Sequence, residues 1–414
     1  MATNNNNKAL NVPHLRFPEF SGEWNKCTIN DLATVVGGGT PDTTVKSYWG
    51  GDIQWFTPSE IGKNKYVDFS LRTITRDGLD NSSAKLLPLH TILLSSRATV
   101  GECSIASNEC TTNQGFQSLI AKQCNIDFLY YLIQTKKKDL IRNACGSTFL
   151  EISANEIRKI KVAVPVQNEQ EQIAKLLSLI DERIATQNKI IEDLKKLKLA
   201  IVETLFCTPK ESMPAKRVST YSKEWKLIKL SDICQRVQTK NTGNQCRQVL
   251  TIAAQHGLVN QEDFFNKTVA SENLEGYYLL QKGDFAYNKS YSGDYTWGAI
   301  KRLERYDKGV LSPLYICFRP DLSKVDADFL AHYFESKKWY KGVADIAGEG
   351  ARNHGLLNIS VIDFFNTTHR IPNLDEQKRI AKILNSLSLK LSCEQRIMQS
   401  LMMQRNYLLR NMFI

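Results

Sequence analysis

The sequence lacks the short motifs that mark most enzymes and metal-binding proteins. Its ten cysteines include no CxxC pair, and there is no HExxH, no GxSxG and no Asn-Pro-Pro-aromatic motif of amino-methyltransferases. The six histidines have no metal-ligand spacing, and the glycine run at residues 37–41 lacks the GK[ST] ending of a phosphate-binding loop. We therefore expect no active site, no metal site and no cofactor in this chain.

Long hydrophobic runs and a signal peptide are also missing. No apolar stretch approaches the roughly 18 residues of a membrane span. The N-terminal MATNNNNKAL is polar and Asn-rich, so residues 1–12 are expected to form a disordered tail. Without chelating or paired spacing the cysteines are expected to be reduced thiols, which predicts a cytoplasmic protein.

Positive charge is in excess, with 54 Lys plus Arg against 43 Asp plus Glu and a net charge of +11. Such an excess suits a polyanionic partner such as nucleic acid, although many basic proteins bind none. At 414 residues the chain is long enough for two or three domains, each with its own core.

One long amphipathic stretch occurs twice, from Asn168 to Phe206 and from Asp375 to Phe413, 207 positions apart. In both copies a narrow seam recurs in steps of four and three, as in a coiled coil, and its polar interruptions match. The first seam contains Ile173, Leu177, Ile180, Ile184, Gln187, Ile191, Leu194, Lys198, Ile201 and Leu205. The second contains Ile380, Leu384, Leu387, Leu391, Glu394, Met398, Leu401, Arg405, Leu408 and Met412.

The two seams predict a pair of long helices that pack on each other. A stripe of two residues in seven suits a single partner helix, and we expect an antiparallel pair, with a parallel pair as the alternative. In the antiparallel pair Gln187 and Glu394 would meet near the axis and fix the register, unless both side chains reach solvent. Asn168 and Asp375 are the predicted N-cap residues of these helices.

The repeat extends beyond the helices, because Trp24–Leu32 and Trp225–Ile233 share a Trp, a short strand and a helix start. Strands are predicted at residues 52–56, 90–94, 117–120, 248–253, 284–287 and 314–318. The predicted fold is α+β, with two pseudo-two-fold-related domains of short mixed strands separated by an antiparallel coiled coil. Its predicted parts are a tail (1–12), a first domain (13–165), a first spacer helix (166–208), a linker and second domain (209–371) and a second spacer helix (372–414).

Several stretches resemble the specificity subunit of type I restriction-modification enzymes. They are VPHLRFPEFSGEW near the N-terminus, the segments Gly38–Gly62, Gly146–Ser153 and Gly348–Ser360, and the paired P-x-x-x-EQ-x-x-IAK-x-L helix starts. The resemblance implies two target-recognition domains, each of which reads half of a split sequence in double-stranded DNA. It also implies two modification (methyltransferase) subunits and restriction (translocase and nuclease) subunits as partners. S-adenosylmethionine, ATP and Mg²⁺ would bind to those partners, and this chain would supply no catalysis.

Candidate DNA-binding residues lie in polar loops, since base readout needs polar side chains at groove edges and cations near phosphates. In the first domain they are Thr57, Arg97, Asn113, Gln114, Ser147 and Thr148. In the second they are Lys289, Tyr291, Arg302, Arg352, Asn353 and His354. Polar residues at turns commonly cap backbone groups instead, so each has a structural alternative. The aromatic cluster Tyr277, Tyr278, Tyr287, Tyr291, Tyr295 and Trp297 is expected to pack in the core rather than to stack on bases.

The two domains differ in sequence outside the shared framework, which predicts an asymmetric bipartite target. The predicted function is therefore that of a sequence-specific DNA-binding subunit that directs methylation and cleavage by its partners. One alternative is a stand-alone DNA-modifying enzyme with built-in specificity, which the missing motifs argue against. The other is a coiled-coil protein-interaction scaffold, which salt-dependent binding to a preferred duplex would exclude.

Overall fold

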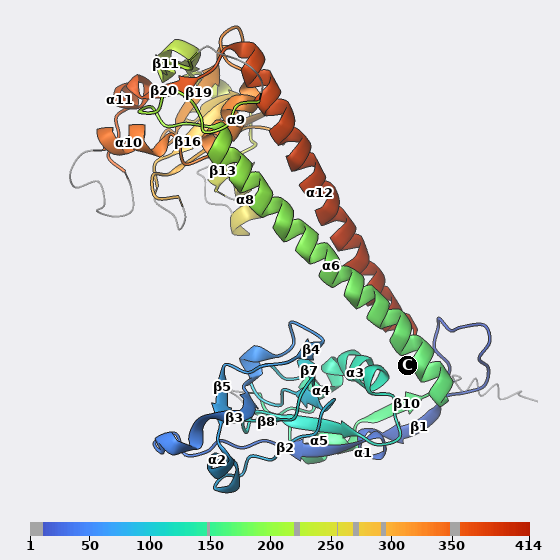
Figure 1. Ribbon diagram of the computed structural model, residues 1–414. Coiled ribbons are helices and arrows are strands. Elements are labelled where there is room, and N and C mark those ends of the chain that lie inside the picture. Colours follow the sequence, from blue (N-terminus) through green and yellow to red (C-terminus); the bar gives the residue numbers. More distant parts are fainter. Residues whose placement is uncertain are drawn as a thin grey trace, which may run out of the picture. The chain divides into compact units, whose positions relative to one another are not determined.

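The computed structural model describes residues 11–146, 150–218, 224–254, 256–267, 273–290, 295–347 and 357–414. Its elements form two successive copies of a strand and helix pattern, and each copy ends in a long helix (Figure 1). The chain divides into two compact units, which are Met1–Asn188 with Arg396–Ile414 (unit 1) and Lys189–Gln395 (unit 2). Each unit therefore contains one domain and one part of each long helix.

Unit 1 contains three sheets, with strand orders β2-β9-β6-β7-β4, β5-β3-β8 and β1-β10. The strands are β1 (Asn25–Thr28), β2 (Ala33–Gly37), β3 (Trp49–Phe56), β4 (Tyr66–Val67), β5 (Arg72–Ile74), β6 (Ile92–Leu94), β7 (Cys103–Ala106), β8 (Cys110–Thr112), β9 (Gln117–Ala121) and β10 (Lys161–Val164). The short helices are α1 (Ile29–Leu32), α2 (Arg76–Asp80), α3 (Ile126–Thr135), α4 (Lys137–Arg142) and α5 (Ala154–Lys159). The predicted strands at 52–56, 90–94 and 117–120 are confirmed within β3, β6 and β9.

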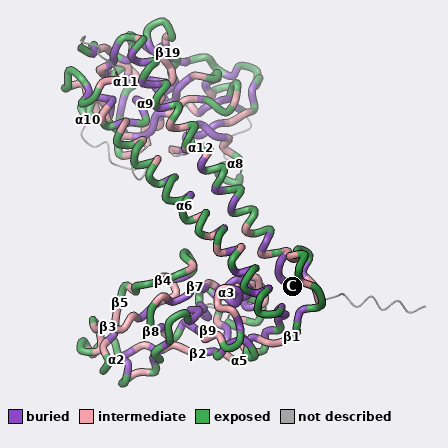
Figure 2. Tube along the Cα trace, turned by 45° about the vertical axis from the view of Figure 1, so that its right-hand side comes forward, coloured by how far each residue is buried: buried purple, intermediate pink, exposed green. Residues whose placement is uncertain are grey.

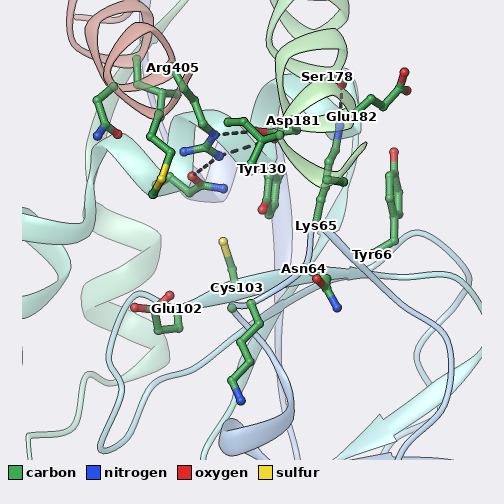
Figure 3. Close-up of a pocket in the computed structure, with 18 of the residues that line it drawn as sticks. Asn64, Lys65, Tyr66, Glu102, Cys103, Tyr130, Ser178, Asp181, Glu182 and Arg405 are labelled. Carbon is green, nitrogen blue, oxygen red and sulfur yellow. Dashed lines mark hydrogen bonds and ion pairs between the residues drawn. The ribbon is translucent and has the colours of Figure 1, made fainter. Parts of the chain in front are cut away.

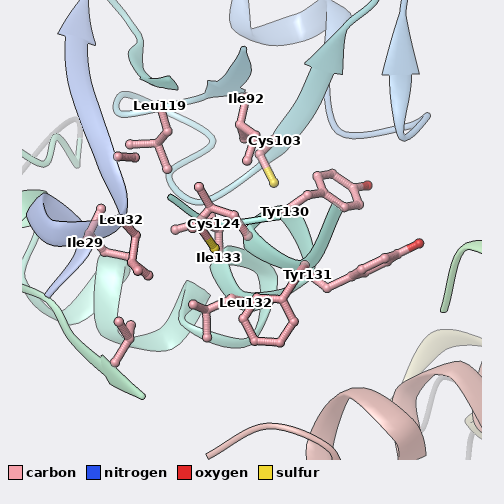
Figure 4. Close-up of a cluster of buried hydrophobic side chains, with 14 of the residues drawn as sticks. Ile29, Leu32, Ile92, Cys103, Leu119, Cys124, Tyr130, Tyr131, Leu132 and Ile133 are labelled. Atoms are coloured by element: carbon pink, nitrogen blue, oxygen red, sulfur yellow. The ribbon is translucent and has the colours of Figure 1, made fainter. Parts of the chain in front are cut away.

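Helix α3 forms the centre of the unit 1 core, and its residues from Phe128 to Ile133 are all buried. Its first turn is capped by Asn125, whose Oδ1 accepts a hydrogen bond from the Phe128 amide at 3.0 Å. Figure 4 shows its side chains close to Ile92 and Leu119 of the five-stranded sheet. The same core cluster includes residues of both long helices, so α3 is covered on two sides and is apolar nearly all round.

Unit 2 contains a four-stranded sheet in the order β12-β19-β16-β17 and the pairs β11-β20, β13-β14 and β15-β18. The strands are β11 (Lys226–Lys229), β12 (Cys234–Arg236), β13 (Leu250–Ala253), β14 (Gly257–Asn260), β15 (Tyr278–Gln281), β16 (Phe285–Asn288), β17 (Ala299–Arg302), β18 (Lys308–Leu311), β19 (Ile316–Pro320) and β20 (Thr368–Ile371). The short helices are α7 (Leu230–Ile233), α8 (Gln261–Phe265), α9 (Ala327–Glu335), α10 (Tyr340–Ile346) and α11 (Val361–Asn366). The predicted strands at 248–253, 284–287 and 314–318 are confirmed in β13, β16 and β19.

The aromatic cluster of the second domain packs mainly in its interior, as the sequence predicted. Tyr278 and Tyr287 are buried, and the Tyr287 ring stacks on Phe364 with a centroid distance of 4.8 Å. Trp297 packs against the same core as Tyr287, while Tyr291 lies outside the described residues. Core packing is therefore confirmed for the cluster members with described contacts.

The long helices are α6 (Gln167–Leu205) and α12 (Leu374–Asn411). In unit 1 the core joins Ile173 and Leu177, near the start of α6, to Leu408 near the end of α12. In unit 2 the core joins Leu205, at the end of α6, to Ile380 near the start of α12. In both units the start of one helix thus packs with the end of the other, and the predicted antiparallel direction is confirmed.

The seam positions of both helices are shielded from solvent. Most of them are buried, and Ile184, Leu194, Lys198, Ile201, Leu387, Leu391 and Arg405 are partly buried. Figure 2 shows both long helices exposed along most of their length, with buried and intermediate residues interspersed. Gln187 and Glu394 are 7% and 6% exposed, and their pairing in register stays a prediction.

Both predicted N-cap positions were wrong by two residues. The helices begin at Gln167 and Leu374, before Asn168 and Asp375. In α12 the acceptor is Asn373, whose Oδ1 accepts from the Glu376 amide at 3.0 Å. Each helix begins two residues after a proline, Pro165 or Pro372, and the residue between them, Val166 or Asn373, occupies the N-cap position.

Candidate nucleic-acid interface

The described candidates of the first domain, Thr57, Arg97, Asn113 and Gln114, lie near one edge of the three-stranded sheet. Strands β3 and β8 run parallel, with Phe56 opposite Thr112, so Thr57 and Asn113 leave the sheet at the same edge. The Asn113 amide donates to the Phe56 carbonyl at 3.0 Å, which holds the two loops together. The parallel pairing therefore brings together residues that are far apart in the sequence.

The turn that carries Arg97 reaches the same edge through Gly115. The Ser96 amide donates to the Gly115 carbonyl at 2.8 Å. A Cβ added at Gly115 would lie 3.0 Å from Asn113 Oδ1 and 3.8 Å from Arg97 Cβ, and 3.1 Å from Pro58 Cγ. A side chain here would crowd Asn113 and Pro58, which would have to shift by a few tenths of an ångström, so glycine suits the close packing of these loops.

The polar side chains at this edge are fixed by local hydrogen bonds. Thr57 donates to Glu60 Oε2 from its amide at 2.7 Å and from its hydroxyl at 2.6 Å. Asn113 Oδ1 accepts from the Gly115 amide at 2.9 Å, and the exposed Gln114 accepts from the Thr40 hydroxyl. Some of these contacts are the backbone-capping contacts that were the structural alternative to DNA binding. They do not use every hydrogen-bonding group, because Asn113 and Gln114 each have further donors and acceptors.

Arg97 is an exposed cation at this edge. Its guanidinium pairs with Glu151 at 2.7 Å, and both side chains are more than 40% exposed. An exposed pair of this kind contributes little to stability, so Arg97 can exchange the carboxylate for a phosphate at small cost. Ser147 and Thr148 lie outside the described residues, between Cys145 and Glu151, whose backbones pair with each other.

The described candidates of the second domain are held more firmly inside the protein. Lys289 accepts from the Leu357 amide at 2.9 Å through its carbonyl and donates to the Ile359 carbonyl at 3.4 Å through Nζ. Arg302 pairs with Glu304 and with Asp328 of α9, each at 2.7 Å. Burial lowers the pKa of Arg302, but these hydrogen bonds raise it above its usual value.

Arg302 therefore joins β17 to α9, in addition to any contact with a ligand. The remaining candidates of this domain, Tyr291, Arg352, Asn353 and His354, lie outside the described residues. Unlike the first domain, the described part of the second domain does not bring its two candidates to one edge through a shared backbone contact.

A cavity of about 790 Å³ lies in unit 1 between the domain and the long helices (Figure 3). On the domain side Lys65 donates to Ser178 Oγ at 2.6 Å and pairs with Asp127 at 2.8 Å. On the helix side Arg405 pairs with Asp181 at 2.5 Å and donates to Gln134 of α3 at 2.9 Å. These charges are neutralised within the cavity wall, so they anchor the domain to the helices.

One element that sequence reasoning missed is a repeated ion pair, here called the clamp. Arg16 pairs with Glu169 of α6 at 2.8 Å, and Arg217 donates from Nε to Glu376 of α12 at 2.9 Å. Both glutamates are 0% exposed. In unit 1 the Trp24 indole also donates to Glu169, at 3.3 Å. The available signal was the spacing, because Arg16 and Arg217 are 201 positions apart, as are Trp24 and Trp225.

The glutamine that follows each clamp glutamate is also buried. Gln170 donates to the Pro165 carbonyl at 3.0 Å and accepts from the Asn125 amide at 3.0 Å. Gln377 repeats this pattern with the Pro372 carbonyl at 2.9 Å and the Asp326 amide at 2.8 Å. The paired EQ motif thus ties the first turn of each long helix to the domain beside it.

A second repeated contact joins the segment before each domain to the end of the other long helix. The Leu15 amide donates to the Asn411 carbonyl at 2.8 Å, and the Lys216 amide donates to the Thr204 carbonyl at 2.9 Å.

Across the described residues no group of His, Cys, Asp and Glu could hold a metal ion. None of the helices formed by these residues combines the length and apolar character needed to cross a membrane.

Comparison with known proteins agrees with this architecture. Residues 21–196 match the family model described as the type I restriction modification DNA specificity domain. The chain is 38% identical over 192 residues to the type I restriction enzyme MjaIX specificity subunit of Methanocaldococcus jannaschii, which covers 44% of each chain. It is 28% identical over 190 residues to the EcoR124I/EcoR124II specificity subunit of Escherichia coli, covering 44% of this chain and 46% of the relative. The matches thus span less than half the length of either relative.

The fold resembles that of a solved protein over almost its full length. The crystal structure of a type I restriction-modification system S subunit from M. genitalium aligns with a TM-score of 0.59 and 19% identity, covering 97% of this chain and 99% of that one. The fold thus defines a class of duplicated α+β proteins with two long antiparallel helices. Within that class, residues 21–196 of this chain carry the match to the type I restriction modification DNA specificity domain.

Proposed function

We propose that this chain reads DNA for a type I restriction-modification complex, with each domain recognising one half of an asymmetric bipartite target. The observation that carries the proposal is the convergence of Thr57, Arg97, Asn113 and Gln114 at one sheet edge. Base readout requires hydrogen-bonding groups held at fixed positions, with a cation that can contact phosphate nearby. The net charge of +11 supports retention on a polyanion.

In this proposal the target-recognition domains span residues 13–165 and 209–371, and the spacer helices span 166–208 and 372–414. Two modification subunits dock on the long helices, and restriction subunits join the complex in the cytoplasm. Support comes from large apolar side chains on helix faces outside the seam, where Leu199 and Met403 are 67% and 68% exposed. S-adenosylmethionine, ATP and Mg²⁺ bind to the partners, and this chain supplies no reacting group.

The experiment measures binding of the assembled complex to its target duplex, identified from the methylome of the source cell. Gln114→Ala should weaken binding by about 5- to 100-fold, mainly through one base position. Arg97→Ala should weaken binding to all sequences and reduce the dependence on salt by about one ion. The matched control is Arg142→Ala, since Arg142 is 75% exposed on α4 and is expected to leave binding unchanged.

Two results would contradict this function. A purified chain that cleaves or methylates DNA unaided would show a stand-alone enzyme. An assembly that forms normally but prefers no duplex sequence would show a protein scaffold. Variants of Ser147, Thr148, Tyr291, Arg352, Asn353 and His354, tested in the same way, would locate the rest of the reading surface.

A further inference from the structure

Two apolar side chains near the reading edge of unit 1 are unusually exposed. Leu71 and Phe69 are 88% and 80% exposed, the highest values among the large hydrophobic side chains that the structure describes. They flank Ser70, whose hydroxyl is turned to the protein and donates to the Arg72 carbonyl at 2.6 Å. Leucine and phenylalanine this far into solvent, and this close together, suggest a contact with another molecule.

The backbone beneath these side chains is firmly held. The Leu71 amide donates to Glu60 Oε1 at 2.6 Å, and the Ser70 amide donates to Gln54 Oε1 at 2.7 Å. The Trp55 amide of β3 donates to the Ser70 hydroxyl at 2.9 Å. The two exposed side chains therefore stand on a fixed segment, and little conformational entropy is lost when they bind.

This segment belongs to the same sheet edge as the candidate reading residues. Strand β5 is antiparallel to β3, with Arg72 opposite Trp55, so Leu71 lies where β3 ends and Thr57 follows. The carboxylate of Glu60 accepts from Leu71 with one oxygen and from Thr57 with the other. One side chain thus fixes the apolar pair relative to Thr57.

The surroundings of the pair favour duplex DNA as its partner. A protein-docking surface is usually a broad apolar patch of several hundred Å². Here two apolar side chains stand beside the hydrogen-bonding groups of Thr57 and Asn113. Arg72, next to Leu71, places its guanidinium 3.6 Å from the centre of the Trp49 ring. Apolar side chains beside polar readers contact thymine methyl groups or wedge between base steps.

We propose that Phe69 and Leu71 make an apolar contact with the bases of the half-site read by unit 1. The inference rests on the proposed DNA-reading function. It adds an apolar component to a surface that the sequence described only by its polar residues. The contact contributes to discrimination between sequences and not to general retention on DNA, because neither side chain carries charge.

The test uses the full chain assembled with its partner subunits and carrying Phe69→Ala with Leu71→Ala. We expect the affinity for the target duplex to fall by about tenfold or more. Affinity for an unrelated duplex and the salt dependence should stay unchanged, because no phosphate contact is lost. The conservative variant Phe69→Leu with Leu71→Met should keep most of the affinity.

The matched control is Leu89→Ala. Leu89 is 49% exposed and precedes β6, whereas Arg97 follows that strand. Leu89 therefore lies at the end of β6 opposite to Arg97. Unchanged affinity of the double alanine variant for the target would overturn the inference. So would loss of partner subunits from the assembly, which would show a protein contact. If the unmutated assembly prefers no duplex, the proposed function itself fails, which is a separate result.

Discussion

Unit 1 and unit 2 fasten the long helices to their domains by several shared contacts, of which the clamp is one, and by one contact that differs. The clamp is shared, since a buried glutamate in the first turn of each helix holds an arginine from the segment before the domain. The difference lies at the basic seam position, which is Arg405 in unit 1 and Lys198 in unit 2. The clamp holds helix and domain together in the same way in both units, whereas the contact of the basic seam residue differs between them.

The divergence moves a negative charge from helix to domain. Arg405 pairs with Asp181 of α6 and donates to Gln134 of α3. In unit 2 the position that matches Asp181 is a serine and the position that matches Gln134 is Glu335, which pairs with Lys198 at 3.5 Å. The fold thus requires a carboxylate beside the basic residue and accepts it from either side.

Removal of the clamp glutamate should have the largest effect on stability. Glu169→Ala leaves the Arg16 guanidinium and the Trp24 indole without their acceptor, and loss of one partner of a buried ion pair costs about 3–5 kcal/mol. Glu376→Ala should cost about 1 kcal/mol less, because the Trp225 indole makes no hydrogen bond that could be lost. Denaturant unfolding measures both costs, and the reverse order would break the comparison.

A transplant of the unit 2 anchor into unit 1 should have an intermediate effect. Asp181→Ser alone removes the carboxylate from Arg405 and should cost about 1–3 kcal/mol. Adding Gln134→Glu, which copies Glu335, should recover at least about half of that loss. The control replaces Gln134 by alanine in the same background and should give no recovery. Equal stability of the two double variants, from thermal unfolding, would show that the anchors are not equivalent.

The pH dependence should be a smaller effect and should belong to unit 2. Burial raises the pKa of Glu335, but the nearby His332 ring, whose Nδ1 lies 3.9 Å from Oε2, and the charges of Lys198 and Lys301 lower it to about 2, from 4.5. A carboxylate with a lowered pKa stabilises the fold above its unfolded pKa, and this stabilisation is lost as the pH falls through the folded value.

We therefore expect unit 2 to lose stability between about pH 4.5 and pH 2. The loss should be modest because the Glu335 side chain is 45% exposed. Thermal unfolding over this range should show a weaker pH dependence in Glu335→Gln than in the unmutated chain. An identical profile in both proteins would assign the pH dependence to other carboxylates.

The length of the helices should affect only the distance between the two half-sites. One added turn in α6, of about four residues after Asn188, adds roughly 6 Å, against 3.4 Å for each base-pair step. The spacer in the target should therefore lengthen by about one or two base pairs, as read from the methylome of cells with the variant and its partners. The same insertion in the linker at Pro209 is the control. An unchanged spacer in the α6 variant would show that helix length does not set the distance between the half-sites.

The sequence predicted those parts of the fold that leave a local, periodic pattern. The seam of α6 and α12 and the matching strands were readable because helix and strand periods repeat within a few residues. The duplication predicted a two-fold arrangement, because related halves pack most simply about such an axis, but it left a parallel pair open, and the antiparallel direction was expected partly from the family resemblance. The N-cap positions were less accurate, since the ends of an element are the part of the pattern that a sequence defines least well.

Contacts between distant residues were not readable in this way. Arg16 and Glu169 are separated by 153 positions, and a glutamate in the first turn of a helix usually faces solvent. Arg302 was predicted from its charge alone, and nothing near it in the sequence indicates Asp328 as a partner. The exposed pair Phe69 and Leu71 was missed for the opposite reason, because apolar residues are assumed to face a core.

The bond from Leu15 to Asn411 and its copy from Lys216 to Thr204 have a consequence for assembly in the cell. Between Thr204 and Lys216 the chain is continuous, whereas Asn411 and Leu15 lie near opposite ends of the sequence, and the local contact is the same. The covalent connection between Thr204 and Lys216 is therefore not needed for this contact to form. It keeps the two domains at a high effective concentration. Their pairing is therefore one to one and does not weaken on dilution, as it would for separate halves.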